Sequence, residues 1–475
     1  MAVEYDLVVI GGGSAGLLVA AVAAALKARV ILIEKHRLGG DCLWYGCVPS
    51  KSFIHAGRMA YNVKQAAKFG IYTQPPDIDF AKAINHVQNV IAAIEPHDSP
   101  ERFENLGVEV VFGDGHFTDK RTFAVNNRSL TARAFVISTG SRPAIPPMPG
   151  LEEAGYITNE QVFEIKTRPD SLAIIGGGPI ACELGQTFSR LGSEVTIIAS
   201  RDCLLPKEEP EAALVVEKQF ESEGIRVIKN TRANKVKLID GKKCISSSDR
   251  SLVTVDQILI AAGRKPNIES LNLEAAGVKL GNQGIAVNAK LQTSNPRIYA
   301  CGDVIGGYQF THVAGYEANI VIRNALFLPL LKADYKVIPW ATFTDPELAR
   351  VGLTEAEARK IYGYDIQVIK LDFADVDRGQ AEGITEGFAK IITKKNGEIL
   401  GAHMVGPIAG ELIHEIVLAM SQKLKISALG GIHIYPTLAE INSKAAFAFT
   451  RYKYEKSHKL QNFFKKLFGF LRTFG

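Results

Sequence analysis

Tyr5-Asp-Leu-Val-Val-Ile-Gly11-Gly-Gly13-Ser-Ala-Gly16 is the stretch that decides the fold of this chain. An apolar strand runs into a glycine-rich turn, an alanine-rich helix follows, and the next apolar strand ends at Glu34. In a β-α-β nucleotide-binding unit, Gly11 allows the tight turn, Gly13 lets a pyrophosphate approach the backbone, and Gly16 lets the helix pack on the strand. Glu34 can accept a hydrogen bond from a ribose hydroxyl. The stretch therefore predicts a dinucleotide site.

A second copy of this pattern begins at Gly176-Gly-Gly178-Pro-Ile-Ala181, again between an apolar strand and a helix. Ala181 takes the place of the third glycine, where close packing tolerates a methyl group. Two such units in one chain predict an α/β protein with two Rossmann-like domains.

The two copies differ at the end of their second strand. Where the first copy has Glu34, the second has Ala199, followed closely by Arg201. The second site thus lacks a carboxylate that would repel a 2′-phosphate, and it has a guanidinium nearby. We expect NADPH rather than NADH at the second site and FAD at the first. In the alternative interpretation, Arg201 is a solvated loop residue.

The composition fits a globular protein of several domains. Of the 475 residues, 47% are hydrophobic, 22% are charged and 43 are glycine, which suits Gly-rich α/β domains. Six cysteines are too few for the disulfide framework of a secreted protein. The N-terminus has no basic start typical of a signal peptide, and no run is apolar enough to span a membrane. We expect a protein of the reducing cytoplasm.

One pair of cysteines is closely spaced, in Gly39-Gly-Asp-Cys42-Leu-Trp-Tyr-Gly-Cys47-Val-Pro-Ser-Lys51. Such a pair closes a small ring at the start of a helix, where amide dipoles stabilise a thiolate and bring reduction within reach of a flavin. A passive disulfide would add little to a cytosolic enzyme of this size. The pair therefore predicts a redox centre.

This segment resembles the redox-active segment of the class I pyridine nucleotide-disulfide oxidoreductases, which include dihydrolipoamide dehydrogenase, glutathione reductase and mercuric reductase. The resemblance covers about 1–455. It implies that hydride equivalents pass from NADPH or NADH through FAD to the pair. Cys42 would be the interchange thiol that faces the substrate, and Cys47 the thiol beside the flavin. Lys51 would lie near the flavin N5, paired with Glu183.

Other segments resemble the cofactor-binding segments of this family. Ser138-Thr-Gly140 and Ala261-Ala-Gly263 resemble those that lead the chain out of its nucleotide-binding regions, and Ile298-Tyr-Ala-Cys-Gly-Asp303 resembles the second FAD motif. The residues expected to bind FAD or the pyridine nucleotide are Gly11, Gly13, Gly16, Glu34, Asp41, Lys51, Gly115, Thr139, Gly140, Asp303, Gly176, Gly178, Ala181, Glu183, Arg201 and Gly263.

The resemblance also implies an order of domains. The first part of the FAD-binding domain would span 1–150, the NAD(P)-binding domain 151–270, the central part of the FAD-binding region 271–335, an α+β interface domain 336–455 and a basic tail 456–475. In this family the interface domain forms a homodimer and completes the neighbour's active site.

The chain departs from the common pattern at Tyr435, which precedes Pro436 and Thr437. Disulfide-reducing and dithiol-oxidising members have a histidine there, oriented by a glutamate that corresponds to Glu440. A histidine, with a pKa of about 6.5, exchanges protons at neutral pH, whereas a phenol, with a pKa of about 10, is a poor base. Mercuric reductases also place a tyrosine here.

We therefore expect a mercuric-reductase-like enzyme with Cys42, Cys47, Lys51, Glu183, Tyr435 and Glu440 as its catalytic residues. A soft thiolate pair suits Hg(II) as a substrate at Cys42 and Cys47, and no structural metal is expected. An unidentified disulfide is the alternative substrate of such an enzyme. The first alternative is a dihydrolipoamide dehydrogenase that uses another base, for which His97 and His433 are candidates. The second is a membrane-surface flavoprotein that reduces a quinone or a protein.

The C-terminal tail is the basis of that second alternative. The chain has a formal net charge of +5, but 451–475 alone hold seven Lys or Arg and one Glu, so the remainder is nearly neutral and nucleic-acid binding is not expected. Apolar residues recur on one face of a helix, with basic residues between them, over 457–475. The tail predicts either contact with an anionic membrane surface or docking on the dimer.

Overall fold

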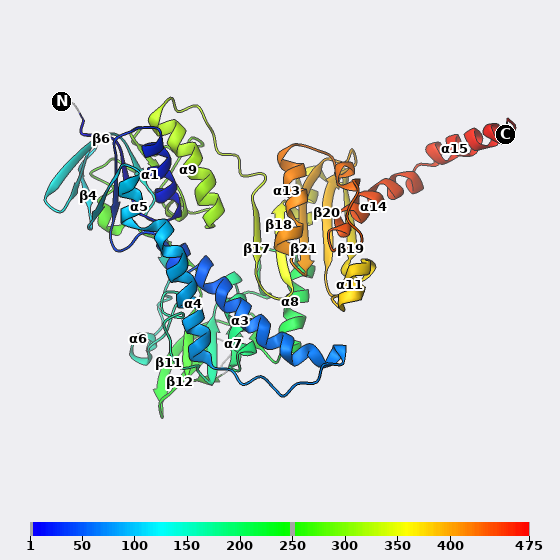
Figure 1. Cartoon of the computed structure of the whole chain (residues 1–475), viewed down its shortest axis with the longest axis horizontal. Coiled ribbons are helices and arrows are strands. Elements are labelled where there is room, and N and C mark those ends of the chain that lie inside the picture. Colours follow the sequence, from blue (N-terminus) through cyan, green and yellow to red (C-terminus); the bar gives the residue numbers. More distant parts are fainter. Residues whose placement is uncertain (1–2, 248–251, 475) are drawn as a thin grey trace. The chain divides into compact units, whose positions relative to one another are not determined.

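The structure, a computed structural model, describes residues 3–247 and 252–474. Residues 1–2, 248–251 and 475 of the expected domains lie outside this described part. The chain divides into two compact units, which we describe one at a time (Figure 1). Unit 1 consists of Met1–Asp202 and Gly224–Tyr335, and unit 2 of Cys203–Glu223 and Lys336–Gly475.

The first sheet of unit 1 contains the first glycine-rich turn. Its parallel strands follow the order β3-β2-β1-β6, and β16 pairs with β6 on the far side. The sheet consists of β1 (Tyr5–Ile10), β2 (Val30–Glu34), β3 (Val108–Phe112), β6 (Arg128–Ile137) and β16 (Ile298–Ala300). Helices α1 (Ser14–Ala25) and α9 (Thr311–Leu326) pack together over one face. Because β1 and β2 are buried on both faces, they read as continuous apolar runs.

The second parallel sheet of unit 1 contains the second glycine-rich turn. It follows the order β10-β9-β8-β14, and helix α7 (Pro179–Arg190) connects β8 to β9. Its strands are β8 (Ser171–Ile175), β9 (Glu194–Ile198), β10 (Arg226–Ile228) and β14 (Gln257–Ile260).

Small antiparallel elements complete unit 1. Strands β4 (His116–Asp119) and β5 (Thr122–Val125) extend β6, β11 (Ala233–Ile239), β12 (Lys242–Ser247) and β13 (Leu252–Val255) form a three-stranded sheet, and β7 (Ser141–Pro143) pairs with β15 (Arg264–Pro266). The remaining helical segments are α2 (Gly40–Trp44), α3 (Cys47–Gln65), η1 (Ala66–Phe69), α4 (Phe80–Ile94), η2 (Glu95–Asp98), α5 (Pro100–Asn105), α6 (Leu151–Ala154), η3 (Glu269–Leu271) and η4 (Asp303–Ile305).

Unit 2 is an antiparallel sheet with helices on it. The strand order is β17-β18-β21-β20-β19, formed by β17 (Pro339–Thr342), β18 (Glu347–Gly352), β19 (Ile366–Asp372), β20 (Phe388–Lys394) and β21 (Ile399–Gly406). Its helical segments are α8 (Pro210–Ser222), α10 (Glu355–Tyr362), η5 (Phe373–Asp375), α11 (Asp377–Glu382), α12 (Ala409–Leu412), α13 (His414–Ser421), η6 (Ile426–Gly430), α14 (Glu440–Lys456) and α15 (His458–Leu471). None of the helices in the described residues is both long and apolar enough to cross a membrane.

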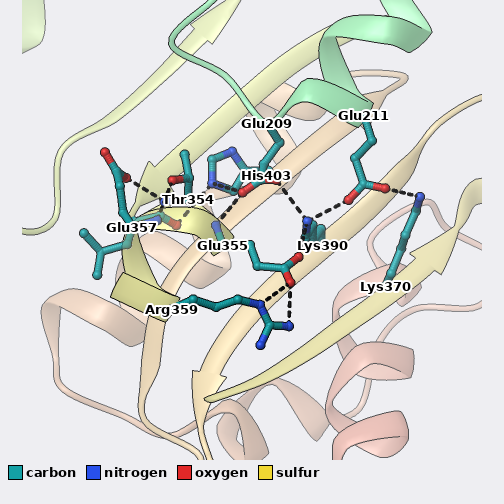
Figure 2. A network of polar contacts seen from close by, with 10 residues as sticks. Glu209, Glu211, Thr354, Glu355, Glu357, Arg359, Lys370, Lys390 and His403 are labelled. Carbon is teal, nitrogen blue, oxygen red and sulfur yellow. Dashed lines mark hydrogen bonds and ion pairs between the residues drawn. The ribbon is translucent and has the colours of Figure 1, made fainter. Parts of the chain in front are cut away.

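A buried ion cluster joins the start of α8 to the sheet of unit 2 (Figure 2). The Nζ atom of Lys390, on β20, lies 2.9 Å from Glu209, 2.7 Å from Glu211 and 2.6 Å from Glu355. Burial disfavours the ammonium, but its hydrogen bonds to the three carboxylates outweigh that effect and raise the pKa of Lys390. Nearby, burial lowers the pKa of His403 to about 3, so its ring stays neutral and its contact with Glu209 is not an ion pair.

Candidate redox site and nucleotide-binding turns

Cys47 is the first residue of α3, and aromatic packing fixes the direction of this helix. Phe53 of α3 packs edge-on against Phe80 of α4 and Phe188 of α7, with ring centroids 5.9 and 5.3 Å apart. A Cβ atom added at Gly57 would lie 3.2 Å from a side-chain carbon of Thr187, so the glycine permits close approach of α3 to α7. Helix α3 is therefore held against α7, the helix that follows the second glycine-rich turn.

Cys42 and Cys47 are free thiols in the structure, the first half-buried and the second exposed. A hydrogen bond from Cys42, supported by Thr311 and by the charge of Lys51, lowers the pKa of the Cys47 thiol. The same hydrogen bond and burial raise the pKa of Cys42. Of the two thiols, Cys47 is therefore the one that ionises first.

Thr311 is a partner of this pair that the sequence analysis missed. Its Oγ1 lies 3.2 Å from the Cys47 Sγ, and it is the first residue of α9. No spacing rule links Thr311 to Cys47, because the two residues meet only in the folded unit.

Lys51 lies one turn after Cys47 and contacts Glu183. Its Nζ is 2.9 Å from the Glu183 carboxylate, which is almost fully buried on α7. The structure thus brings together the two residues that the sequence analysis paired, and it places a cation close to the thiolate. A buried carboxylate is stabilised by a neighbouring positive charge, and Lys51 supplies one to Glu183.

The first glycine-rich turn leaves the start of α1 open. Gly11 has a φ of +104°, and a Cβ added at Gly16 would lie 1.9 Å from the Gly11 carbonyl oxygen, so neither position tolerates a side chain. Among the described atoms that are not its chain neighbours, only Gly40 lies within 4 Å of a Cβ added at Gly13, at 3.9 Å. The Glu34 carboxylate accepts hydrogen bonds from the backbone N–H of Gly12, at 2.7 Å, and of His36. Among the described side chains, none caps α1 at Gly13.

The second turn repeats this arrangement at α7. Gly176 has a φ of +141°, and an added Cβ would lie 2.2 Å from the Ala261 carbonyl oxygen. Within the described residues, no atom lies within 4 Å of a Cβ added at Gly178, and no side chain caps the helix. Ala181 is fully buried, as expected for the position of close packing. Arg201 is exposed just beyond the end of β9.

Acidic and basic side chains meet where the chain leaves the two nucleotide-binding regions. The Ser141 hydroxyl donates to Asp303 at 2.6 Å, and burial raises the pKa of Asp303. Arg264 lies 3.1 Å from Asp41 and 3.6 Å from Asp303. Arg264 thus links two of the expected cofactor-binding carboxylates, a role for which no motif in the sequence gave a signal.

The other expected cofactor residues lie in three loops. The Thr139 hydroxyl donates to the Asn267 carbonyl at 2.6 Å, and open space surrounds Gly140 and Gly263 among the described atoms. An added Cβ at Gly115 would meet the Phe123 ring at 2.3 Å, so packing by itself accounts for this glycine.

In unit 2, the Tyr435 hydroxyl donates to Asp377 at 2.8 Å. This hydrogen bond raises the pKa of Tyr435 and keeps the phenol protonated. Glu440 accepts from the backbone N–H of Thr437 at 3.4 Å. His433 contacts the Gly431 carbonyl with Nδ1 and Glu415 with Nε2, at 2.9 and 3.1 Å.

The residues present fit a dinucleotide at each glycine-rich turn. An uncapped helix N-terminus offers backbone N–H donors and a positive dipole end, which suit a pyrophosphate, and the space beside Gly13 and Gly178 lets one approach. Flavin, when bound, would take up hydride equivalents from a reduced nicotinamide and supply them to a disulfide.

Comparison with known proteins now identifies the family. Residues 5–318 match the pyridine nucleotide-disulphide oxidoreductase family, and residues 338–446 match its dimerisation domain. The chain belongs to the class I pyridine nucleotide-disulphide oxidoreductases. This membership confirms the expected fold class, the dependence on FAD and a pyridine nucleotide, and the assignment as an oxidoreductase.

Two kinds of enzyme are similar to this oxidoreductase at nearly equal identity. It is 36% identical over 454 residues to the mercuric reductase of Staphylococcus aureus, which covers 94% of this chain and 83% of the relative. It is 34% identical over 443 residues to a dihydrolipoyl dehydrogenase of Bacillus subtilis (strain 168), which covers 91% and 96%.

Solved structures show the same fold over nearly the whole chain. LpdA from Mycobacterium tuberculosis superposes with a TM-score of 0.86 at 28% identity and covers 93% of this chain and 99% of its own. The Cu(II) complex of the HOCl-induced flavoprotein disulfide reductase RclA from Escherichia coli has a TM-score of 0.84 at 28% identity, and covers 94% and 99%.

Proposed function

We propose that this oxidoreductase is a mercuric-reductase-like enzyme that uses NADPH to reduce Hg(II) or an unidentified disulfide at Cys42 and Cys47. The observation that carries the proposal is the hydrogen bond that the Tyr435 hydroxyl donates to Asp377. This bond raises the pKa of Tyr435, and a phenol is a poor base at neutral pH. The similarity to mercuric reductases supports the same substrate class. The complex of RclA with Cu(II) supports a thiol-reactive metal as a ligand.

The reaction balances without a further reactant. NADPH yields NADP⁺, a proton and two electrons, and these two electrons convert Hg(II) to Hg(0). With a disulfide as acceptor, the two electrons and two protons, one of them from water, form two thiols. Only the second reaction requires a group that protonates a leaving thiolate, and this is the step for which other members use a histidine.

Each proposed residue has a defined task. Cys47 holds the thiolate next to the flavin, Cys42 contacts the acceptor, and Lys51, held by Glu183, stabilises negative charge beside them. The dimerisation domain supports a homodimer in which Tyr435 acts at the neighbour's cysteine pair. The reactive thiols suit the reducing cytoplasm.

The second candidate function is that of a dihydrolipoamide dehydrogenase. The similarity of this chain to a dihydrolipoyl dehydrogenase favours that function. It would need another base. His433 contacts oxygen atoms with both ring nitrogens. Although burial opposes the charged form, these contacts raise the pKa of His433, so less of its ring is unprotonated and free to accept a proton at neutral pH. His97 is exposed next to Asp98, whose carboxylate lies 3.2 Å from a Cβ added at Gly39. His97 is therefore the better candidate.

Anaerobic two-electron reduction is expected to produce a long-wavelength charge-transfer band between the Cys47 thiolate and the flavin. The thiolate should persist below about pH 8.5, the pKa of a free thiol, because the pKa of Cys47 is lowered, and the band should fade as the pH falls through that lowered pKa. The measurement is an absorbance titration with NADPH at several pH values.

Three variants test this assignment. Cys47→Ser should remove the band, whereas Cys42→Ser should show it before any reductant is added, because no disulfide can form. Cys244→Ser, on strand β12, serves as the control and should behave as wild type. If wild type passes directly to fully reduced flavin with no band, the roles of the two cysteines are wrong.

The coenzyme preference is expected to favour NADPH over NADH by at least about tenfold in kcat/KM, roughly 1.4 kcal/mol. Ala199 offers no carboxylate to repel a 2′-phosphate, and Arg201 is exposed close to it. Arg201→Gln should reduce the preference by raising the KM for NADPH while leaving NADH turnover unchanged.

Arg226→Gln is the matched control, because it removes an exposed guanidinium at the start of the neighbouring strand β10. It should leave both KM values as in wild type. Equal efficiency of wild type with both coenzymes would show that Arg201 is a solvated loop residue.

A further inference from the structure

Helix α15 has an apolar face that the rest of the described chain leaves uncovered. In the described structure, no residue of α15 is buried. Phe463 is 57% exposed, Phe468 54% and Phe470 62%. Large apolar side chains grouped on one helix at such exposure mark an interaction surface.

The basic residues of α15 border this face on both sides. At about 100° per residue, the apolar side chains cover an arc of about 160° of the helix. Lys465 and Arg472, the residue directly after the helix, flank one edge of the arc, and Lys459 and Lys466 flank the other. The helix has no Asp or Glu, so its charge is uniformly positive. Such an arrangement is typical of helices that lie in the interface of an anionic bilayer.

Polar contacts at the base of α15 hold the helix without covering its apolar face. Ser457 caps the helix by accepting from the N–H of Leu460 at 3.3 Å, and the Gln461 amide donates to the Glu455 carbonyl at 2.8 Å. The ring of Tyr454, on α14, contacts Phe464, with centroids 6.0 Å apart. Beyond this contact, α15 extends away from the sheet of unit 2 (Figure 1).

A second copy of this chain is a less suitable partner for this face. The family's dimerisation domain matches residues 338–446 and therefore ends before α15 begins. Two α15 helices packed face to face would bring their lysines and arginines together, and like charges at short range repel. Anionic phospholipid supplies both the apolar phase and the opposite charge.

We propose that α15 binds the surface of an anionic phospholipid bilayer, with its phenylalanines and leucines among the acyl chains and its basic residues at the phosphates. At about 1.5 Å per residue, its 14 residues span about 21 Å, less than the hydrocarbon core of about 30 Å. The helix therefore lies on the bilayer and does not cross it. This inference does not depend on which acceptor the enzyme reduces.

The test is cosedimentation of the FAD-loaded full-length protein with vesicles. Vesicles of 70% phosphatidylcholine and 30% phosphatidylserine should bind it, and vesicles of phosphatidylcholine alone should bind it at least about tenfold more weakly. Binding should also weaken with rising salt concentration. A variant that lacks 457–475 should no longer sediment with either vesicle, and its charge-transfer band on reduction should be unchanged.

Point variants separate the two contributions. Phe468→Ser combined with Leu471→Ser should weaken binding to the anionic vesicles at least about tenfold. Lys465→Gln combined with Lys466→Gln should weaken it about 25-fold, at about fivefold per charge. Asn462→Ser, on the polar face, is the matched control and should bind as wild type.

Three results would overturn the proposal. The first is that the full-length protein does not bind anionic vesicles, and the second is that deletion of 457–475 leaves binding unchanged. The third is that the deletion converts a dimer into a monomer in analytical ultracentrifugation while vesicle binding is absent, which would assign α15 to the dimer.

Discussion

Wild-type enzyme is expected to reduce Hg(II)-thiol complexes while its turnover of dihydrolipoamide and of glutathione disulfide lies about 10²–10⁴-fold below that of a histidine-bearing relative. This range is the usual contribution of general acid-base catalysis. The deficit follows from Tyr435, whose hydroxyl donates to Asp377 and whose pKa is raised by that hydrogen bond. A phenol held in this way donates a proton poorly and accepts one only at high pH.

Two substitutions of Tyr435 are expected to have opposite effects. Tyr435→Phe should lower Hg(II) turnover, since the hydroxyl is lost, but leave flavin reduction by NADPH unchanged. Tyr435→His should raise dithiol and disulfide activity, because an imidazole at this position can exchange protons at neutral pH. The measurement is steady-state turnover with the three acceptors, together with stopped-flow reduction of the flavin.

Variants of His97 and His433, the two histidines considered as alternative bases, serve as controls. His97→Gln and His433→Gln should leave Hg(II) turnover unchanged. If wild type is robustly active with dihydrolipoamide and His97→Gln removes that activity, His97 is the base and the protein is a dihydrolipoamide dehydrogenase. In that case the mercuric-reductase-like proposal fails, while the assignment of the cysteine pair stands.

Lys390→Met is expected to destabilise unit 2 by about 3–5 kcal/mol, because breaking a buried ion pair leaves uncompensated charge. Only 6% of the Lys390 side chain and 5% of the Glu209 side chain are exposed. Without the ammonium, Glu209, Glu211 and Glu355 face one another with much of their compensation lost. For a unit of this size the transition temperature should fall by roughly 6–20 °C, measured by differential scanning calorimetry of the FAD-loaded protein.

A surface ion pair whose lysine is on the same strand is the matched control. Lys394 contacts Glu398 at 2.9 Å, but the carboxylate is half exposed. Lys394→Met should therefore change stability far less than Lys390→Met does. Lys390→Met combined with Glu209→Gln should recover part of the loss, since one of the uncompensated charges is removed. An equal effect of the Lys390 and Lys394 variants would show that the cluster in Figure 2 contributes no more than a surface ion pair.

Local patterns were sufficient to predict the elements around both nucleotide-binding turns. An apolar strand was expected directly before each turn, and the structure has Tyr5–Ile10 before Gly11 and Ser171–Ile175 before Gly176, because buried parallel strands are uninterrupted apolar runs. Gly11 and Gly176 lie at positive φ, as their turns require.

Contacts between distant residues could not be predicted in this way. Thr311 beside Cys47, Arg264 beside Asp41 and Asp303, and Asp377 beside Tyr435 each join residues that no local period relates. The pairing of Lys51 with Glu183 was expected only through the family resemblance, for the same reason.

By itself, the sequence determined the two glycine-rich turns, the cysteine pair at the start of a helix, the tyrosine at position 435 and the basic apolar face of the tail. These features depend only on the type of each residue and on how far apart neighbouring residues are in the sequence. Backbone geometry alone then places such residues in a turn or on one face of a helix. Only the tertiary structure decided which thiol ionises first, which carboxylates Lys390 compensates, and that Asp377 holds the Tyr435 hydroxyl. Electrostatic effects depend on distance and burial, and both are set when segments far apart in the chain pack together.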